Sequence, residues 1–198
     1  NTLEDEEFGE RTYMSPGFAH LLGYVRYPAT DSAGFYFSTE TEGVSGVEAI
    51  FDDRLRGENG VLLTERNARG EERSSEAVVR AIAGENITLS IDARVQASLH
   101  THIQALADQI PFRGGAGVIL DVDTGEVLAL TNYPEYNPNI LAEGEDREAI
   151  ASYQEDVRKP YLNRAVTGLF SPGSVVKPFV ATAALEENLV NVNNTFLS

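Results

Sequence analysis

The residues best suited to covalent chemistry in this chain are Ser174 and Lys177, in the tetrapeptide Ser-Val-Val-Lys. A spacing of three residues places the hydroxyl and the amine on one face of a helix, within reach of each other. A lysine whose ammonium is desolvated by apolar neighbours can lose its proton near neutral pH and then act as the base that activates a serine. The pattern therefore predicts Ser174 as a nucleophile and Lys177 as its base.

The residues around this pair fit the start of a helix. At a helix N-terminus the backbone N–H of Ser174 has no intrahelical partner, so it can face a developing oxyanion. Gly173 permits the close approach of a substrate, and Pro178 falls in the first helical turn, where a missing N–H costs little. The same residues also fit a structural role, with Ser174 as a helix cap and Lys177 as a solvated side chain. Spacing alone leaves both interpretations open.

A second candidate is the tripeptide Asp123-Thr124-Gly125, which matches the tripeptide of aspartic proteases, where two aspartates share one proton. However, Glu126 stands where a small residue is usual, and a hairpin turn explains the same residues. Asp121 and Asp123 also suggest a calcium loop, but the glycine comes one position early and the bidentate glutamate is missing. We therefore interpret this segment as a turn.

The composition argues against several further classes of protein. The chain has 198 residues, no cysteine and a formal net charge of −16 at pH 7, so thiol chemistry is excluded and nucleic acid is a poor partner. His100 and His102 lie two apart on a predicted helix and diverge too far to share a metal ion. The longest run without a charged residue, Thr12–Val25, has 14 residues, fewer than the about 18 that a membrane span needs. We expect no metal, no organic cofactor and no membrane span in this chain, with any export signal or anchor outside it.

The elements that must position Ser174 divide into two parts at a change of composition near Gly84. In the first part, residues 1–10 carry five acids and no base and are expected to be solvated. We predict a strand over residues 19–27 and an amphipathic helix within residues 43–60. Residues 61–84 interleave polar and apolar side chains around turn-forming residues at 67–70, which predicts two strands.

The second part begins with a β-branched segment, residues 86–91, which we expect to be a strand leading into an N-cap at Asp92. A helix of about five turns is predicted after it, because apolar residues recur at helical spacing: Val95, Leu99, Ile103, Leu106 and Ile110.

A hairpin is expected next, with two well-buried strands at residues 116–122 and 126–132. Residues 144–157 are acidic and compatible with a helix, and residues 174–189 form a last predicted helix. The pattern indicates the α+β class.

Three segments carry residue patterns that occur together in one family. Residues 43–60 fit the pattern G-x-x-G-x-E-x-x-F-D-x-x-L-x-G-x-x-G through Gly43, Gly46, Glu48, Phe51, Asp52, Leu55, Gly57 and Gly60. Residues 115–139 fit a hairpin and the loop after it, with Asn137 where aspartate is commoner. The pattern N-R-A…P-G-S-x-x-K is matched by Asn163, Arg164, Ala165, Pro172, Gly173, Ser174 and Lys177. Together these segments resemble the class B penicillin-binding proteins, the cell-wall transpeptidases of elongation and division.

The resemblance implies a fold with two modules. Residues 1–84 would be the pedestal, or dimerisation, domain, and residues 85–198 the first part of a serine β-lactamase-like transpeptidase domain with an α/β sandwich. It also implies a location at the outer face of the cytoplasmic membrane.

The resemblance further implies a reaction and its partners. Ser174 would attack the carbonyl between the two terminal D-alanines of a peptidoglycan stem peptide, Lys177 would accept its proton, and an amine of a neighbouring stem peptide would resolve the acyl-enzyme into a cross-link. β-Lactams would acylate the same serine. Other cell-wall synthesis proteins would dock on the pedestal.

One departure from the family pattern limits what the chain does by itself. The family's Ser-x-Asn and Lys-Thr-Gly motifs do not occur after Lys177. We therefore expect this chain to be an incomplete portion of the transpeptidase that acylates slowly or not at all. The alternatives are a non-catalytic interaction module of the cell-wall machinery, or a β-lactam sensor or lactamase of the same superfamily.

Overall fold

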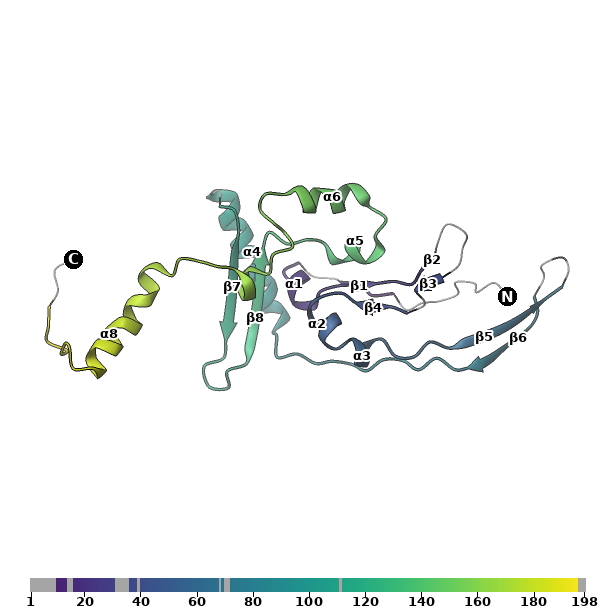
Figure 1. Cartoon of the computed structure of the whole chain (residues 1–198), viewed down its shortest axis with the longest axis horizontal. Helices are drawn as coiled ribbons and strands as arrows, with labels where there is room; N and C mark the ends of the chain where they lie inside the picture. The colour runs from purple at the N-terminus through teal and green to yellow at the C-terminus, as the bar shows by residue number, and fades with distance from the viewer. Residues whose placement is uncertain are drawn as a thin grey trace. The chain divides into compact units, whose positions relative to one another are not determined.

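The computed structural model describes residues 10–13, 16–30, 36–38, 40–67, 69, 72–110 and 112–195. Its helices and strands form two compact units, Asn1–Thr167 and Gly168–Ser198. Helices and two-stranded antiparallel sheets alternate along the first unit, which confirms the predicted α+β class (Figure 1). The predicted solvated segment of residues 1–10 lies outside the described residues except for Glu10, and the predicted turn at 67–70 is described only at Asn67 and Arg69.

The first described elements differ from the predicted strand over residues 19–27. Residues Ala19–Leu22 form helix α1, and only Val25–Arg26 form a strand, β1, which pairs with β4 (Glu42–Gly43). The amides of Leu22 and Gly23 donate to the carbonyls of Phe18 and Ala19, and Gly23 then turns the chain with φ of +76°. The strand prediction was wrong there because a run of apolar residues has no period that separates a buried helical turn from a strand. A second pair, β2 (Ala29–Thr30) and β3 (Tyr36–Ser38), follows.

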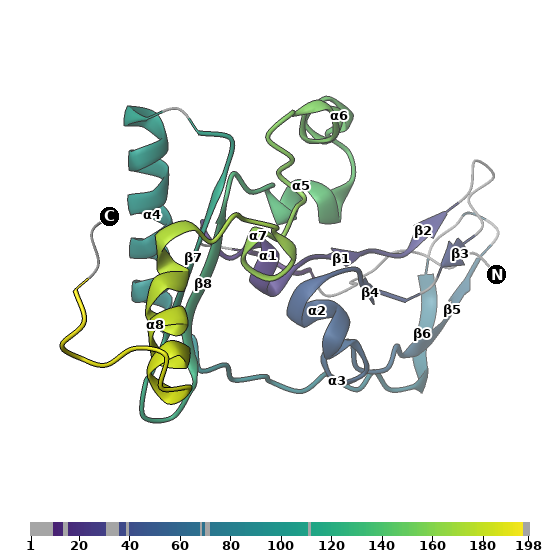
Figure 2. The same cartoon turned by 60° about the vertical axis from the view of Figure 1, so that its left-hand side comes forward.

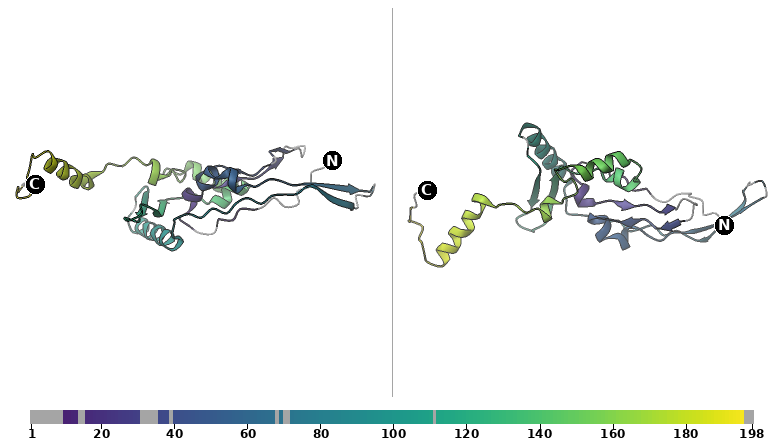
Figure 3. Two further views of the ribbon diagram at one scale, coloured as in Figure 1. Left: turned by 90° about the horizontal axis from the view of Figure 1, so that it is seen from below. Right: turned by 45° about the horizontal axis from the view of Figure 1, so that its top comes forward.

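The helix predicted within residues 43–60 is confirmed, as two short helices, α2 (Gly46–Ile50) and α3 (Asp52–Leu55). Gly57, with φ of +70°, comes directly after the C-cap of α3. The two predicted strands of residues 61–84 are also confirmed as the antiparallel hairpin β5 (Val61–Arg66) and β6 (Glu72–Val79). This hairpin extends away from α2 and α3 (Figure 3).

Helix α4 spans Ala93–Gln109, close to the predicted five turns. The Asp92 carboxylate caps it by accepting from the amides of Arg94 and Val95, at 2.9 and 3.3 Å. Residues 86–91, predicted as a strand, pair with no strand of the described residues; their end is held instead by the Ser90 hydroxyl, which donates to the Val127 carbonyl. The β-branched residues there favour an extended backbone but do not by themselves supply a neighbouring strand.

The predicted hairpin is confirmed as β7 (Gly115–Leu120) and β8 (Val127–Tyr133). The expected burial of both strands was wrong for β7, whose Val118 side chain is 46% exposed, whereas Ala129 of β8 is fully buried. Helix α4 packs mainly along β8 (Figure 2). Gly117 on β7 allows α4 to approach the hairpin closely, since a Cβ at this position would lie 2.8 Å from a Leu99 methyl carbon.

Three helices complete the first unit: α5 (Pro138–Glu143), α6 (Arg147–Glu155) and α7 (Arg164–Thr167). Helix α6 confirms the helix predicted within residues 144–157. Helix α5 packs against β1, and α7 against β7 and β8. The second unit contains a 3₁₀ turn, η1 (Gly173–Val176), that runs directly into α8 (Lys177–Glu186). Among the helices of the described residues, none is long and apolar enough to cross a membrane.

Candidate active site

Ser174 and Lys177 lie on one tight turn in the second unit. Ser174 is in η1, and Lys177, the first residue of α8, donates its backbone N–H to the Ser174 carbonyl. In a 3₁₀ turn residues three apart eclipse each other, so their side chains share a face more closely than in an α-helix. Gly173 enters the turn with φ of +56°, a left-handed conformation that favours glycine, and Pro178 occupies the first turn of α8 as predicted.

The second unit by itself does not enclose this pair. Residues 171–180 are exposed throughout, and within the described residues the side chains of Ser174 and Lys177 make no hydrogen bond. The turn therefore brings the two positions together, but the apolar enclosure that would desolvate Lys177 is not supplied by residues 168–195. The catalytic roles of both residues stay predictions.

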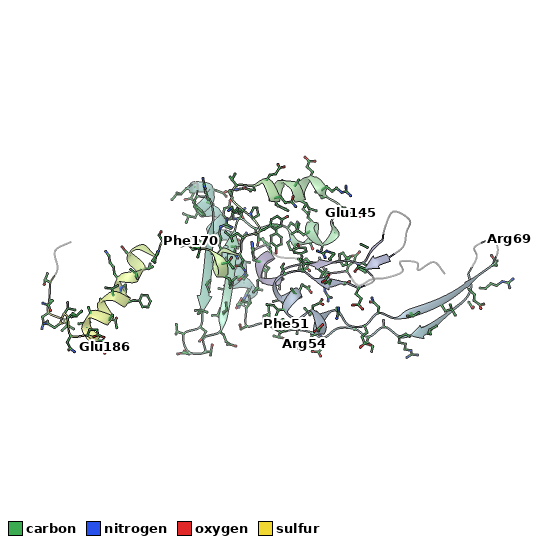
Figure 4. All side chains as sticks on the ribbon, viewed as in Figure 1. Phe51, Arg54, Arg69, Glu145, Phe170 and Glu186 are labelled. Atoms are coloured by element: carbon green, nitrogen blue, oxygen red, sulfur yellow. The ribbon has the colours of Figure 1, made fainter. Side chains whose placement is uncertain are left out.

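The exposed surface around the pair is strongly apolar. Phe179 is 74% exposed, and other apolar side chains of the unit are also exposed: Leu169, Phe170, Val175, Val176, Val180 and Leu189. The side chains of α8 stand out around the helix between the labelled Phe170 and Glu186 (Figure 4). A helix that is apolar on all sides is typical of a helix buried in the core of a larger domain. Such burial would also remove water from Lys177.

The glycines of the 43–60 pattern serve close packing. Gly46 has φ of +60°, and a Cβ there would lie 2.6 Å from the Leu21 carbonyl oxygen. A Cβ at Gly43 would collide with the Glu48 carbonyl, and one at Gly23 with the Ser45 carbonyl. Gly23 and Gly46 therefore let α1 and α2 touch through their backbones, and Gly43 lets β4 lie against α2.

The acids of the same pattern are structural as well. Glu48 lies 3.4 Å from the Arg11 guanidinium and accepts from the Tyr13 hydroxyl at 3.3 Å. Asp52 accepts from the Gly43 amide at 2.9 Å. Arg11 also donates to the Leu55 carbonyl at 2.7 Å, so it ties the chain before α1 to both short helices. None of these groups is placed as a nucleophile or a base.

The N-R-A residues form a second structural network. The buried Asn132 side chain on β8 donates to Asn163 at 3.2 Å and accepts from the Ala165 amide at 2.7 Å. The buried Arg164 guanidinium donates to the carbonyls of Arg158, Lys159 and Leu162. The motif thus folds the loop before α7 and anchors α7 to the hairpin.

A buried polar network that our sequence analysis missed joins α4, β8 and the segment before α1. The Gln96 side chain is fully buried; it donates to the carbonyls of Gly17 and Leu130 and accepts from the Leu130 amide at 2.7 Å. Glu135 accepts from the Gly17 amide at 2.5 Å and the Ala19 amide at 3.2 Å, and it lies 3.6 Å from His100 Nε2. Burial raises the pKa of Glu135. Gln96 lies beside the predicted apolar stripe of α4 rather than in it, so the sequence carried no signal for this network.

The remaining candidates are structural within the described residues. The Asp121 carboxylate accepts from the amides of Asp123 and Thr124, both at 2.9 Å, so the protease-like tripeptide is a hairpin turn, as we interpreted it. These amides hold the pKa of Asp121 below its usual range. His100 is buried against Thr131 whereas His102 is exposed, and no group of three potential metal ligands occurs among the residues described.

The sequence and fold match proteins of known kind. Residues 6–89 match the family model of the penicillin-binding protein dimerisation domain, and residues 115–198 match that of the penicillin-binding protein transpeptidase domain. Together the two models cover most of the chain.

Individual relatives agree. The peptidoglycan D,D-transpeptidase MrdA of Haemophilus influenzae is 32% identical over 98% of this chain, and FtsI of Escherichia coli is 33% identical over 89%. A chain in a solved peptidoglycan synthase complex, which coordinates polymerization and crosslinking, is 33% identical over 90% of this chain, with a TM-score of 0.71.

This chain spans 30% of MrdA, 26% of FtsI and 33% of the chain in the complex. Both domain models match in the order in which the sequence patterns occur. The chain therefore belongs to the class B penicillin-binding proteins.

Proposed function

We propose that the protein carrying this chain is a peptidoglycan D,D-transpeptidase that uses Ser174 as its nucleophile and Lys177 as its general base. The observation that carries the proposal is the shared turn: Ser174 and Lys177 three residues apart, entered by a left-handed glycine, at the start of an apolar helix. The relatives named peptidoglycan D,D-transpeptidase support the reaction.

The reaction proceeds in two transfers. Ser174 Oγ bonds to the carbonyl carbon between the two terminal D-alanines while its proton passes to Lys177 Nζ. The C–N bond then breaks, and D-alanine leaves with that proton. An amine of a second stem peptide attacks the resulting ester, and Ser174 Oγ departs with a proton as the cross-link forms. A β-lactam replaces the first substrate and leaves Ser174 acylated.

The apolar surface of α8 gives this chemistry its physical basis. Once other parts of the protein cover Phe179 and its neighbours, Lys177 loses water, and desolvation disfavours its charged form. The exposed pair in residues 168–195 is therefore expected to react slowly until that enclosure is complete.

The proposed setting is the cell envelope, at the outer face of the cytoplasmic membrane, with the anchor outside this chain. The proposed partners are peptidoglycan stem peptides, β-lactams and other cell-wall synthesis proteins that bind the dimerisation segment. The solved synthase complex among the similar structures supports this class of partner.

Fluorescent penicillin tests the nucleophile. The protein over its complete length should be labelled stoichiometrically, and Ser174→Ala should abolish labelling. Ser171→Ala, three residues away on the same exposed segment, is the matched control and should label at the wild-type rate. Labelling that persists in Ser174→Ala would disprove the assignment. If penicillin binding survives while partner recruitment also stays intact, the alternative of a non-catalytic interaction module gains support.

Lys177→Arg tests the base. Arginine keeps the positive charge but does not release its proton in proteins, so the second-order acylation rate should fall by about 10²–10⁴-fold. The circular dichroism spectrum should not change. An acylation rate within about threefold of wild type would remove Lys177 from the reaction.

A further inference from the structure

An open cavity of about 390 Å³ lies in the first unit between the segment before α1 and the loop that leads into α5. Its walls include three tyrosines, Tyr13, Tyr136 and Tyr153, and one acidic residue, Glu135. The volume is in the range of small-molecule sites. Neither the 43–60 pattern nor the Ser174 turn uses this cavity.

The charge in the cavity selects the kind of ligand. Among the described residues that line it, Glu135 carries the one formal charge. The Glu135 side chain is 13% exposed, and the Gly17 and Ala19 amides hold its two oxygens in place. A carboxylate offers about four lone-pair positions, so acceptor capacity remains beyond these two amides and the more distant His100 ring. Burial raises the pKa of Glu135, against the Gly17 and Ala19 amides and the His100 ring, which lower it.

The three tyrosine hydroxyls each have one protein partner. The Tyr136 hydroxyl donates to the Ala19 carbonyl at 3.0 Å, the Tyr13 hydroxyl donates to Glu48, and the Tyr153 hydroxyl accepts from the Asn137 amide at 3.3 Å. The Tyr136 ring is buried and packs against the rings of His20, Tyr24 and Tyr161. The electron-rich rings left to attract a cation are therefore those of Tyr13 and Tyr153.

We propose that this cavity binds a primary alkylammonium group, with the charge beside the Tyr13 and Tyr153 rings and an N–H donated to Glu135. A primary ammonium suits the site better than a quaternary one, because only the primary ion has hydrogens to donate to the carboxylate. The proposal goes beyond the transpeptidase reaction and does not depend on it. Either a free amine or a lysine-like side chain of a peptide carries the required group.

Two backbone amides report binding directly. The Gly17 and Ala19 N–H groups bond to Glu135, so their resonances in the ¹⁵N-labelled chain should shift saturably when n-butylammonium chloride is added at constant ionic strength. Tetramethylammonium should bind more weakly, and 1-butanol should produce no saturable shift. Constant ionic strength matters because a chain of net charge −16 attracts every cation. Saturation by 1-butanol, or equal shifts with sodium chloride alone, would overturn the proposal.

A matched pair of variants tests the aromatic wall. Tyr153→Leu removes the ring and should weaken n-butylammonium binding by about two- to thirtyfold, whereas Tyr153→Phe keeps the ring and should bind within about twofold of wild type. Unchanged Gly17 and Ala19 resonances in the free variants show that the Glu135 contacts are intact. Equal weakening in both variants would contradict the ring contribution. Binding of Nα-acetyl-lysine methylamide that is tighter than binding of n-butylammonium would identify a peptide as the source of the ammonium group. Equal binding of the two compounds would identify a free amine.

Discussion

His20 is a buried histidine without a hydrogen-bond partner for either ring nitrogen among the described residues. Its ring packs edge-on against Tyr136, with centroids 5.1 Å apart. Burial lowers the pKa of His20 to about 4, and the nearby Arg164 charge lowers it as well. The Pro160 backbone acts in the opposite direction and raises this pKa. The folded protein therefore holds His20 neutral at pH values where an unfolded chain would protonate it.

This gives the protein a pH-dependent stability that belongs to one residue. Because the folded pKa lies below the unfolded value, the unfolded chain binds more protons between about pH 6.5 and pH 4, and the free energy of unfolding falls as the pH drops through that range. The loss attributable to His20 is on the order of 3 kcal/mol. Urea unfolding at pH 7 and pH 4.5 measures it.

His20→Gln should reduce the difference in the free energy of unfolding between pH 7 and pH 4.5. Substitution of the exposed His102, as His102→Gln, serves as the matched control. An unchanged pH dependence in His20→Gln would show that the buried carboxylates, not His20, dominate.

The residues predicted to carry out the chemistry are not the buried residues that hold the fold together. The pair predicted from spacing, Ser174 and Lys177, lies in the second unit on an exposed turn, whereas the polar side chains that the first unit buries completely are structural. Gln96 and Asn132 were not recognisable in advance, because an amide side chain shows its partners only when distant backbone segments meet it. Gln96 meets Gly17 across 79 positions of sequence.

At the scale of elements, backbone contact between α1 and α2 depends on glycine. Gly46 combines a left-handed backbone with crowded surroundings, whereas Gly144, at the C-cap of α5, has a similar φ of +70° and no atom of the described residues near the Cβ position. Substitutions at these two positions therefore distinguish the free-energy cost of a left-handed backbone from the cost of a steric clash at Cβ.

Alanine substitutions at these glycines give the prediction for this scale. Gly144→Ala should cost about 1–2 kcal/mol of unfolding free energy, the penalty of the left-handed conformation alone. Gly46→Ala should cost more than Gly144→Ala, because its Cβ would also press on the Leu21 carbonyl. Urea denaturation at pH 7 compares both variants with wild type. Equal losses of unfolding free energy in the two variants would mean that α1 and α2 move apart without a free-energy cost.

Local patterns identified most of the elements. Helix α4, its Asp92 cap, the two hairpins, α6 and α8 were predicted, since each depends on residues close in sequence. The helix predicted from Ser174 begins as the 3₁₀ turn η1 and becomes α-helical only at Lys177. The errors fell at residues 19–27 and 86–91 and at the burial of β7. In each of these cases the outcome depended on what lay beside the segment rather than on its own residues.

At the scale of the whole molecule, charge is the dominant feature. The net charge of −16 makes the compact state repel itself. Ion pairs such as Arg54 with Glu85 at 2.6 Å are exposed, and exposed pairs contribute little. Salt that screens the charges should therefore weaken the repulsion among the acidic residues more than it weakens the attraction within the ion pairs.

Salt should accordingly stabilise the protein. Raising sodium chloride from 0.05 to about 1 M shortens the screening length to about 3 Å, and the free energy of unfolding should rise on the order of 1 kcal/mol. Chemical denaturation with urea, which carries no charge, measures the change. Potassium chloride should give the same result if screening is the cause. A decrease with both salts would show that attractive ion pairs outweigh the repulsion.

The sequence by itself determined the class of the fold, the family patterns and the Ser174 and Lys177 pair, because all of these reside in residue types at short, constant spacings. Only the tertiary structure decided that the pattern glycines and acids are packing residues, that Gln96 and Glu135 hold the segment before α1, and that three tyrosines and Glu135 line one cavity. The physical reason is that burial and hydrogen bonding are set by segments far apart in the chain. No local pattern records which distant carbonyl or ring will arrive beside a given side chain.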